Sequence, residues 1–148
     1  MLFTLLFAWL VATTCMTGFS YLFSSLLNEN FKEPQLLTDL LGEVLHSKLP
    51  LWVGWVLHYA TGILFLGVLI LAFSFSTIEI SILWGILFGA LLGGLGIFMW
   101  KGLYKIAQTD PPTQTRLFHL QLIIAHIFFV MGAIAVERWY AAYLQVLL

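Results

Sequence analysis

Two histidines lie inside apolar stretches of the chain that contain no charged residue. His58 lies in the segment 49–78 and His126 in the segment 117–136. An ionisable side chain inside a membrane helix is costly to bury and is by default a sign of function. Imidazole is a common axial ligand of haem iron, and it can also donate a hydrogen bond to a quinone. The pair therefore indicates a b-type haem, with His58 and His126 ligating its iron, or a quinone between them.

A structural role for His58 is the hypothesis that the sequence favours over a ligand. Its imidazole would be neutral and would donate a hydrogen bond to a backbone or hydroxyl oxygen, which locks two helices together. In the haem interpretation, Lys101 and Arg116 are the candidate cofactor-binding residues, because they lie at the membrane boundary and could pair with the propionates.

The elements that must position these residues are membrane-spanning helices. The chain has 148 residues, of which 61% are hydrophobic and 9% are charged. About 20 apolar residues are needed to cross a bilayer as a helix, and four segments without charge are long enough. We predict an all-α integral membrane bundle of four transmembrane helices, in a single domain over 1–148. The predicted spans are 2–26, 52–75, 80–100 and 117–137.

The basic residues predict an orientation. Five of them fall in the first and third loops, namely Lys32, Lys48, Lys101, Lys105 and Arg116, and only Arg138 falls on the other side. Cytoplasmic loops carry the excess of Lys and Arg. We therefore expect these loops in the cytoplasm, both termini outside it, and a bacterial inner membrane as the location. The short segment 74–79 predicts that the second and third spans are antiparallel neighbours.

The first loop carries its own helical pattern over 35–48. Its apolar residues recur at helical spacing and its polar residues mark the opposite face. This pattern predicts a short amphipathic helix that lies on the membrane surface. An alternative is that the same helix packs onto the bundle as a lid.

Three glycines share one face of the third span: Gly85, Gly89 and Gly93. Glycines at four-residue spacing allow another backbone to approach closely, which is how helices associate in lipid. The face is expected to pack against another helix of the same chain. The alternatives are a seam between two copies of the chain and a contact with a larger membrane complex.

Several function classes are disfavoured by what the chain contains. The net charge is −1 and no basic run is present, so nucleic acid is not an expected partner. No carboxylate falls in the middle of a predicted span, which argues against proton-coupled transport. No complete catalytic set is recognisable. An enzyme is therefore the less favoured interpretation, and membrane lipid is the expected surrounding partner.

Three motifs carry a resemblance to a known group. They are Gly54-Trp55-x-x-His58-Tyr59-x-x-Gly62, Pro112-x-x-x-Arg116 before the last span, and Ala125-His126 followed by Gly132. Together they resemble a family of small bacterial four-helix inner-membrane proteins classed as a domain of unknown function, over about Met16 to Ala135. The family pattern has a Pro-Gly step where this chain has Met99-Trp100-Lys101-Gly102. The resemblance implies a pairing of His58 with His126 and no particular activity.

The leading hypothesis from the sequence is a non-catalytic inner-membrane protein, either a subunit of a larger assembly or a homo-oligomer. It rests on the absence of a complete catalytic set. The second hypothesis is a membrane redox or ligand-binding protein that holds a b-type haem or a quinone between His58 and His126.

Overall fold

The computed structural model describes residues 2–74, 81–111 and 114–147, and these residues form five α-helices. They are α1 (Leu2–Leu27), α2 (Glu33–Leu45), α3 (Trp52–Ser74), α4 (Ile82–Ala107) and α5 (Thr115–Leu147). Within the described residues, α1, α3, α4 and most of α5 are long and apolar enough to cross a membrane. This finding fits the predicted helical bundle and suggests an integral membrane protein.

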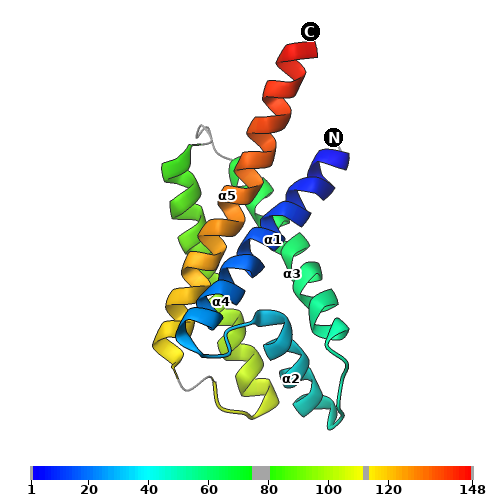
Figure 1. The fold of residues 1–148 in the computed structure, drawn as a ribbon, viewed down its shortest axis with the longest axis vertical. Helices are drawn as coiled ribbons and strands as arrows, with labels where there is room; N and C mark the ends of the chain where they lie inside the picture. Colours follow the sequence, from blue (N-terminus) through cyan, green and yellow to red (C-terminus); the bar gives the residue numbers. More distant parts are fainter. Residues whose placement is uncertain (1, 75–80, 112–113, 148) are drawn as a thin grey trace.

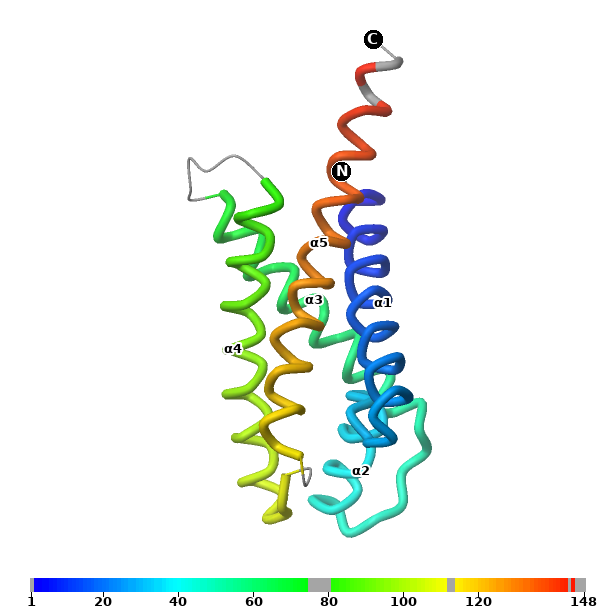
Figure 2. Tube along the Cα trace, turned by 60° about the vertical axis from the view of Figure 1, so that its left-hand side comes forward, coloured from blue at the N-terminus to red at the C-terminus, as the bar shows by residue number. Residues whose placement is uncertain are grey.

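The helix α5 is the centre of the bundle. It packs along α1 on one side and along α4 on the other (Figure 2). The helix α3 crosses behind this layer and contacts α1, and α2 fills the space between α3 and α4 at one end (Figure 1). We call this end the α2 end. The links between α1 and α2 and between α2 and α3 both lie there.

The helix ends follow from local chemistry. The side chain of Ser81 accepts a hydrogen bond from the backbone N–H of Trp84 and caps the start of α4. Pro34 occupies the first turn of α2, where its missing N–H has no helical partner to lose. His46 and Gln108 adopt the left-handed conformation that ends α2 and α4.

The three predicted packing glycines lie against α5. A Cβ at Gly89 would lie 2.5 Å from the Cα of Ile127, and one at Gly93 would lie 2.5 Å from the Cα of Ile123. At Gly85 the added atom would meet Ile134 Cδ1 at 2.8 Å. This face is therefore covered inside the chain. The sequence left open an interface between two copies of the chain through the same glycines. Such an interface cannot form, because α5 already covers these glycines.

The helix boundaries differ from the prediction mainly at charged ends. The predicted third span stops at residue 100, whereas α4 continues to Ala107, and the predicted fourth span stops at residue 137, whereas α5 continues to Leu147. Charged residues mark the boundary of the hydrocarbon core of a membrane. They do not mark the end of a helix, because the end of a helix is set by capping. The structure also places α2 at Glu33–Leu45 instead of 35–48.

The second and third spans are not packed along their lengths. The helix α3 packs on α1 and α2 instead of on α4, although the Phe73 and Phe88 rings meet at a centroid distance of 4.9 Å. The connecting turn lies in residues 75–80, outside the described residues. The expectation of neighbouring spans was therefore wrong for most of their length, because α2 separates them at the α2 end.

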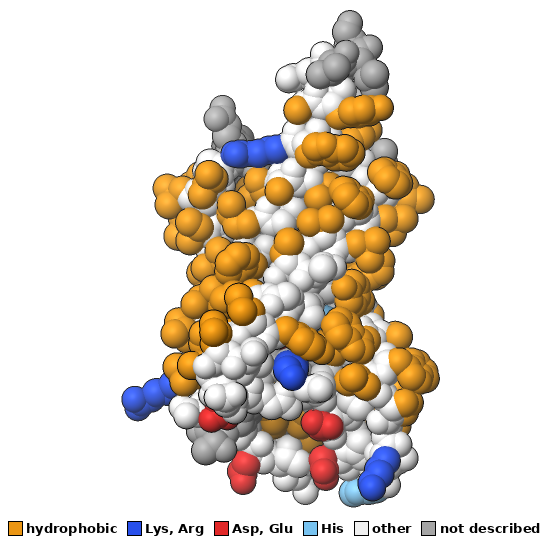
Figure 3. Space-filling view, in the orientation of Figure 1, with side chains coloured by type: hydrophobic (Ala, Val, Ile, Leu, Met, Phe, Trp, Pro, Cys, Tyr) orange, Lys and Arg blue, Asp and Glu red, His pale blue; other side chains and the backbone are white. Residues whose placement is uncertain are grey.

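The helix α2 packs onto the bundle through part of its surface. Pro34, Thr38 and Leu40 are buried, whereas Val44 and Leu45 remain 42% and 56% exposed. Figure 3 shows acidic and basic side chains gathered at the α2 end and hydrophobic side chains over the middle of the visible face. The lid alternative is therefore realised, and the placement of α2 on a membrane surface remains a prediction.

Candidate functional site

Both predicted histidines line one cavity near the α2 end. The cavity has a volume of about 60 Å³, and His58 and His126 are each 4% exposed. All five helices contribute to its wall, which is formed by Met16, Glu33, Leu37, His58, Thr61, Gly62, Phe65, Gly96, Met99, Trp100, Leu103, Leu122 and His126. The fold thus brings His58 of α3 and His126 of α5 to a common space.

The hydrogen bonds around His58 determine which ring nitrogen carries the proton. The Thr17 hydroxyl donates to the backbone oxygen of Thr13 at 2.7 Å, so its own hydrogen is used. Thr17 Oγ1 also lies 2.8 Å from His58 Nε2. The hydroxyl must therefore accept at this contact, and Nε2–H must donate. In the neutral ring, Nδ1 of His58 is left as an acceptor.

The opposite nitrogen is protonated in His126. Its Nδ1 lies 2.7 Å from the backbone oxygen of Leu122, and a carbonyl oxygen can only accept. Nδ1–H therefore donates, which leaves Nε2 as the acceptor of the neutral ring. The ring packs against Phe65 at a centroid distance of 4.8 Å. A Cβ at Gly96 would lie 2.8 Å from Cε1 of His126, so Gly96 provides the space for this edge of the ring.

A buried carboxyl group, Glu33, completes the polar part of the cavity wall. Glu33 is 3% exposed at the start of α2. Its Oε1 accepts from the Ser20 hydroxyl of α1 at 2.6 Å and from Nε2 of Gln121 of α5 at 2.7 Å. The sequence prediction missed Glu33 as a site residue, because it considered only carboxylates within the predicted spans, and Glu33 lies outside them in α2.

The second oxygen of Glu33 has no partner. Oε2 is buried and forms no hydrogen bond with any described residue, and the same holds for Oε1 of Gln121. Burial raises the pKa of Glu33 to about 7, although the hydrogen bonds from Ser20 and Gln121 act in the opposite direction. Near neutral pH the group therefore exists in both forms. Because Oε1 already accepts two hydrogen bonds, Oε2 is the oxygen that carries the added proton.

Two signals in the sequence could have revealed this group. Glu33 precedes Leu37 and Leu40 at helical spacing, which places it on the inward face of α2. The helix α1 also carries a stripe of buried hydroxyl residues at helical spacing, formed by Thr13, Thr17, Ser20 and Ser24. Such a stripe inside a membrane helix requires polar partners, and Glu33 is one of them.

The cavity does not suit a haem held by both histidines. Pockets for small molecules of drug size measure about 300–1,000 Å³, far more than the about 60 Å³ present here. His58 Nε2, one of the two nitrogens that could ligate iron, is engaged with the Thr17 hydroxyl. Within the described part of the chain, no three His, Cys, Asp or Glu side chains are placed to hold a metal ion.

The two basic residues predicted to bind the cofactor do not reach this cavity. Lys101 and Arg116 are exposed and are absent from its wall. Lys101 instead lines a separate pocket between the end of α4 and the start of α5. Of the four predicted cofactor-binding residues, the structure therefore brings together His58 and His126. The ionisable group beside them is the carboxyl of Glu33.

Comparison with protein-family models, with characterised proteins and with solved structures finds no match to this chain. The resemblance to small bacterial four-helix membrane proteins accordingly remains an expectation.

Proposed function

We propose that this chain is a small integral membrane protein that binds a hydrogen-bonding molecule between Glu33, His58 and His126. The unpartnered Oε2 of Glu33 is the observation that carries this proposal. A buried polar atom without a partner costs free energy, and its persistence is usually explained by a ligand, an ion or a water molecule. Three polar groups of the wall then offer one donor, which is Oε2–H, and two imidazole acceptors.

The cavity favours a ligand that approaches from the lipid. Its wall includes Met99 and Leu103 of α4, which are 37% and 36% exposed on the outer surface of the bundle. The helices α3 and α4 do not pack along their lengths and leave this side less covered. A volume of about 60 Å³ holds a few water molecules or a small polar headgroup. A quinone headgroup is the ligand class we favour, because its carbonyl oxygen accepts from Oε2–H of Glu33. In the reduced form of the same headgroup, hydroxyl groups supply the donors that the imidazole acceptors require.

A transmembrane proton path is not part of the proposal. Beyond the histidines the bundle is filled by an apolar cluster that includes Ala12, Leu69, Phe129 and Ile134. Proton relays through membranes use chains of ionisable groups. The described residues of this half provide no such chain, so the site is proposed to bind protons and ligand from one side only.

A titration of ligand binding tests the proposal. A short-chain benzoquinone serves as the probe for the protein in detergent or nanodiscs. If the probe accepts from Oε2–H, its affinity falls about tenfold for each pH unit above the Glu33 pKa of about 7. Glu33→Gln keeps a donor and is expected to bind without this pH dependence. Saturable binding that is unchanged in Glu33→Leu would overturn the assignment, and so would the absence of binding.

We further propose an orientation with the α2 end in the cytoplasm of a bacterium and both termini outside. The basic residues of the loops support it through the positive-inside rule. The exposed Val44 and Leu45 support the placement of α2 against the membrane surface. Single cysteines at Lys48 and at Arg138, in a Cys15→Ala background, test it by labelling of intact cells. Labelling of position 48 from outside would reverse the orientation.

The hypothesis of a non-catalytic subunit or homo-oligomer stays compatible with this site. It requires an interface other than the glycine face of α4, which α5 already covers. Purification in mild detergent tests it directly. A strict monomer without a co-purifying protein would leave ligand binding as the function to pursue.

A further inference from the structure

A second pocket with a different chemistry lies between the end of α4 and the start of α5. Its volume is about 360 Å³, so it has room for a complete polar headgroup. It is lined by Trp100, Lys101, Tyr104, Lys105, Gln108, Thr109, Asp110, Pro111, Thr115, Phe118 and His119. It shares only Trp100 with the wall of the cavity around Glu33, and the ligand proposed above has no part in it.

Two cations of one helix contribute to this pocket. Lys101 and Lys105 are four residues apart on α4 and therefore share a face. His119 of α5 adds a ring that can donate hydrogen bonds, and Thr115 lies at the start of α5. These groups are donors and positive charges, which is the chemistry that recognises a phosphate group.

Unpartnered hydroxyl groups give an independent indication of a ligand. Tyr104 is only 9% exposed, and its hydroxyl forms no hydrogen bond with any described residue. The hydroxyl of Thr109 is likewise buried without a partner in the described residues. Both residues line the pocket, and both also line an adjoining pocket that contains the acidic residues Asp39 and Glu43. A phosphate oxygen is an acceptor that could satisfy either hydroxyl.

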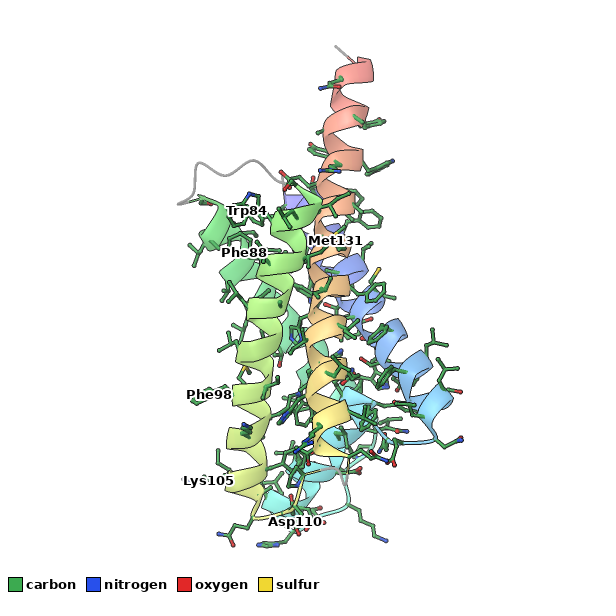
Figure 4. All side chains as sticks on the ribbon, turned by 90° about the vertical axis from the view of Figure 1, so that its left-hand side faces the viewer. Trp84, Phe88, Phe98, Lys105, Asp110 and Met131 are labelled. Atoms are coloured by element: carbon green, nitrogen blue, oxygen red, sulfur yellow. The ribbon has the colours of Figure 1, made fainter. Side chains whose placement is uncertain are left out.

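The position of the pocket along α4 agrees with a lipid headgroup layer. The helix α4 has 26 residues, which corresponds to a length of about 39 Å. The hydrocarbon core is about 30 Å thick, so the last turns extend beyond it. Trp100 and Tyr104 lie in these turns, as aromatic residues commonly do at headgroup level. Figure 4 shows Lys105 and Asp110 at this end of the bundle.

We propose that Lys101, Lys105 and the Tyr104 hydroxyl bind a phosphate group in this pocket. The group belongs either to a phospholipid or to a free phosphate compound. Asp110 also lines the pocket and is the one acidic residue among its described lining residues. Its carboxylate opposes a phosphate, so its removal is expected to strengthen binding.

Retention of lipid by the purified protein tests the proposal. Native mass spectrometry of the whole chain in mild detergent measures phosphatidylglycerol bound per protein, and a titration with inorganic phosphate measures its displacement. Lys101→Gln and Lys105→Gln are each expected to weaken lipid binding about fivefold. Tyr104→Phe is expected to weaken lipid binding, and Asp110→Asn is expected to strengthen it. Lys48→Gln removes the same charge from an exposed loop position and is the matched control.

Each outcome assigns the source or overturns the proposal. Displacement by millimolar phosphate indicates a soluble phosphate compound, whereas retention of lipid under phosphate indicates a headgroup. Equal weakening in Lys48→Gln and Lys101→Gln would show nonspecific charge attraction and overturn the site. Failure to bind either lipid or phosphate would overturn it as well. Glu33→Gln is expected to retain the lipid, which separates this site from the proposed function.

Discussion

Glu33 and Gln121 lie 88 positions apart in the sequence, yet Nε2 of Gln121 donates to Oε1 of Glu33 at 2.7 Å. The same amide nitrogen also donates to the hydroxyl of Ser20 at 2.5 Å. Three helices, α1, α2 and α5, thus meet at one buried carboxyl group. Because each partner is itself buried, removing one of them leaves each of the others with one hydrogen bond fewer in a medium of low polarity.

Glu33 makes the stability of the fold depend on pH. An unfolded chain loses the Glu33 proton at the ordinary pKa of 4.5, whereas the folded protein keeps it up to about pH 7. The folded state therefore binds more protons in this window, and stability decreases as pH rises through it and is constant above it. Relative to Glu33→Gln, the wild type is expected to lose about 3 kcal/mol of unfolding free energy across the window.

Unfolding in denaturing detergent at a series of pH values measures this difference. Glu43 is exposed on the same helix, and Glu43→Gln serves as the control. A Glu33→Gln profile parallel to the wild type between pH 5 and pH 7 would contradict the assignment.

The glycine face of α4 is expected to tolerate no added methyl group at its centre. In Gly89→Ala the new Cβ would lie 2.5 Å from the Ile127 Cα, so α4 and α5 must separate. We expect a loss of about 1–3 kcal/mol. Gly94 has nothing within 4 Å of an added Cβ, and Gly94→Ala is expected to gain up to about 1 kcal/mol. Thermal unfolding of both variants tests the pair, and equal effects would refute the proposed packing.

The tautomer of His58 is a direct spectroscopic prediction. Nitrogen-15 chemical shifts of labelled histidine should show Nε2 protonated and Nδ1 bare, because Thr17 accepts from Nε2–H. Thr17→Val removes the acceptor and is expected to abolish this fixed signature and to cost about 1–2 kcal/mol. Thr14 is exposed on the same helix and pairs with the Tyr59 hydroxyl instead. Thr14→Val should leave the His58 signals unchanged.

The docking of α2 depends on Gly54. A Cβ at this position would overlap the backbone oxygen of Pro34 and the Thr38 hydroxyl. Gly54→Ala is therefore expected to loosen α2, with hydrogen exchange of its backbone amides faster by about tenfold or more. Gly67 of the same helix has nothing within 4 Å, and Gly67→Ala should leave exchange in α2 unchanged. Equal protection of α2 in both variants would contradict the observed docking.

The spans and the two histidines were predictable because they depend on local composition. Stretches of about 20 residues without charge are long enough to cross the hydrocarbon core of a membrane. His58 and His126 are ionisable residues within such stretches. Glu33 was not predicted, because it lies in a loop region by composition and becomes buried only when α2 docks between α3 and α4.

Lys101 lies at a different pocket from the one expected. Its position at the end of an apolar stretch suggested a partner for a cofactor near the histidines. The side chain lies on the face of α4 that meets the start of α5, beside a different pocket. Tertiary packing decides which neighbouring helix each face of a helix end contacts. The charge of a single residue does not predict this contact.

The central place of α5 has a consequence for how the bundle is made. Both α1 and α4 pack mainly on α5, and α5 is synthesised after the other four helices of this bundle. Until it inserts, the hydroxyl stripe of α1 lacks Gln121, and the glycine face of α4 lacks its partner backbone. The earlier spans must therefore wait in the bilayer as separately inserted helices, and the bundle closes in a late, concerted step of biogenesis.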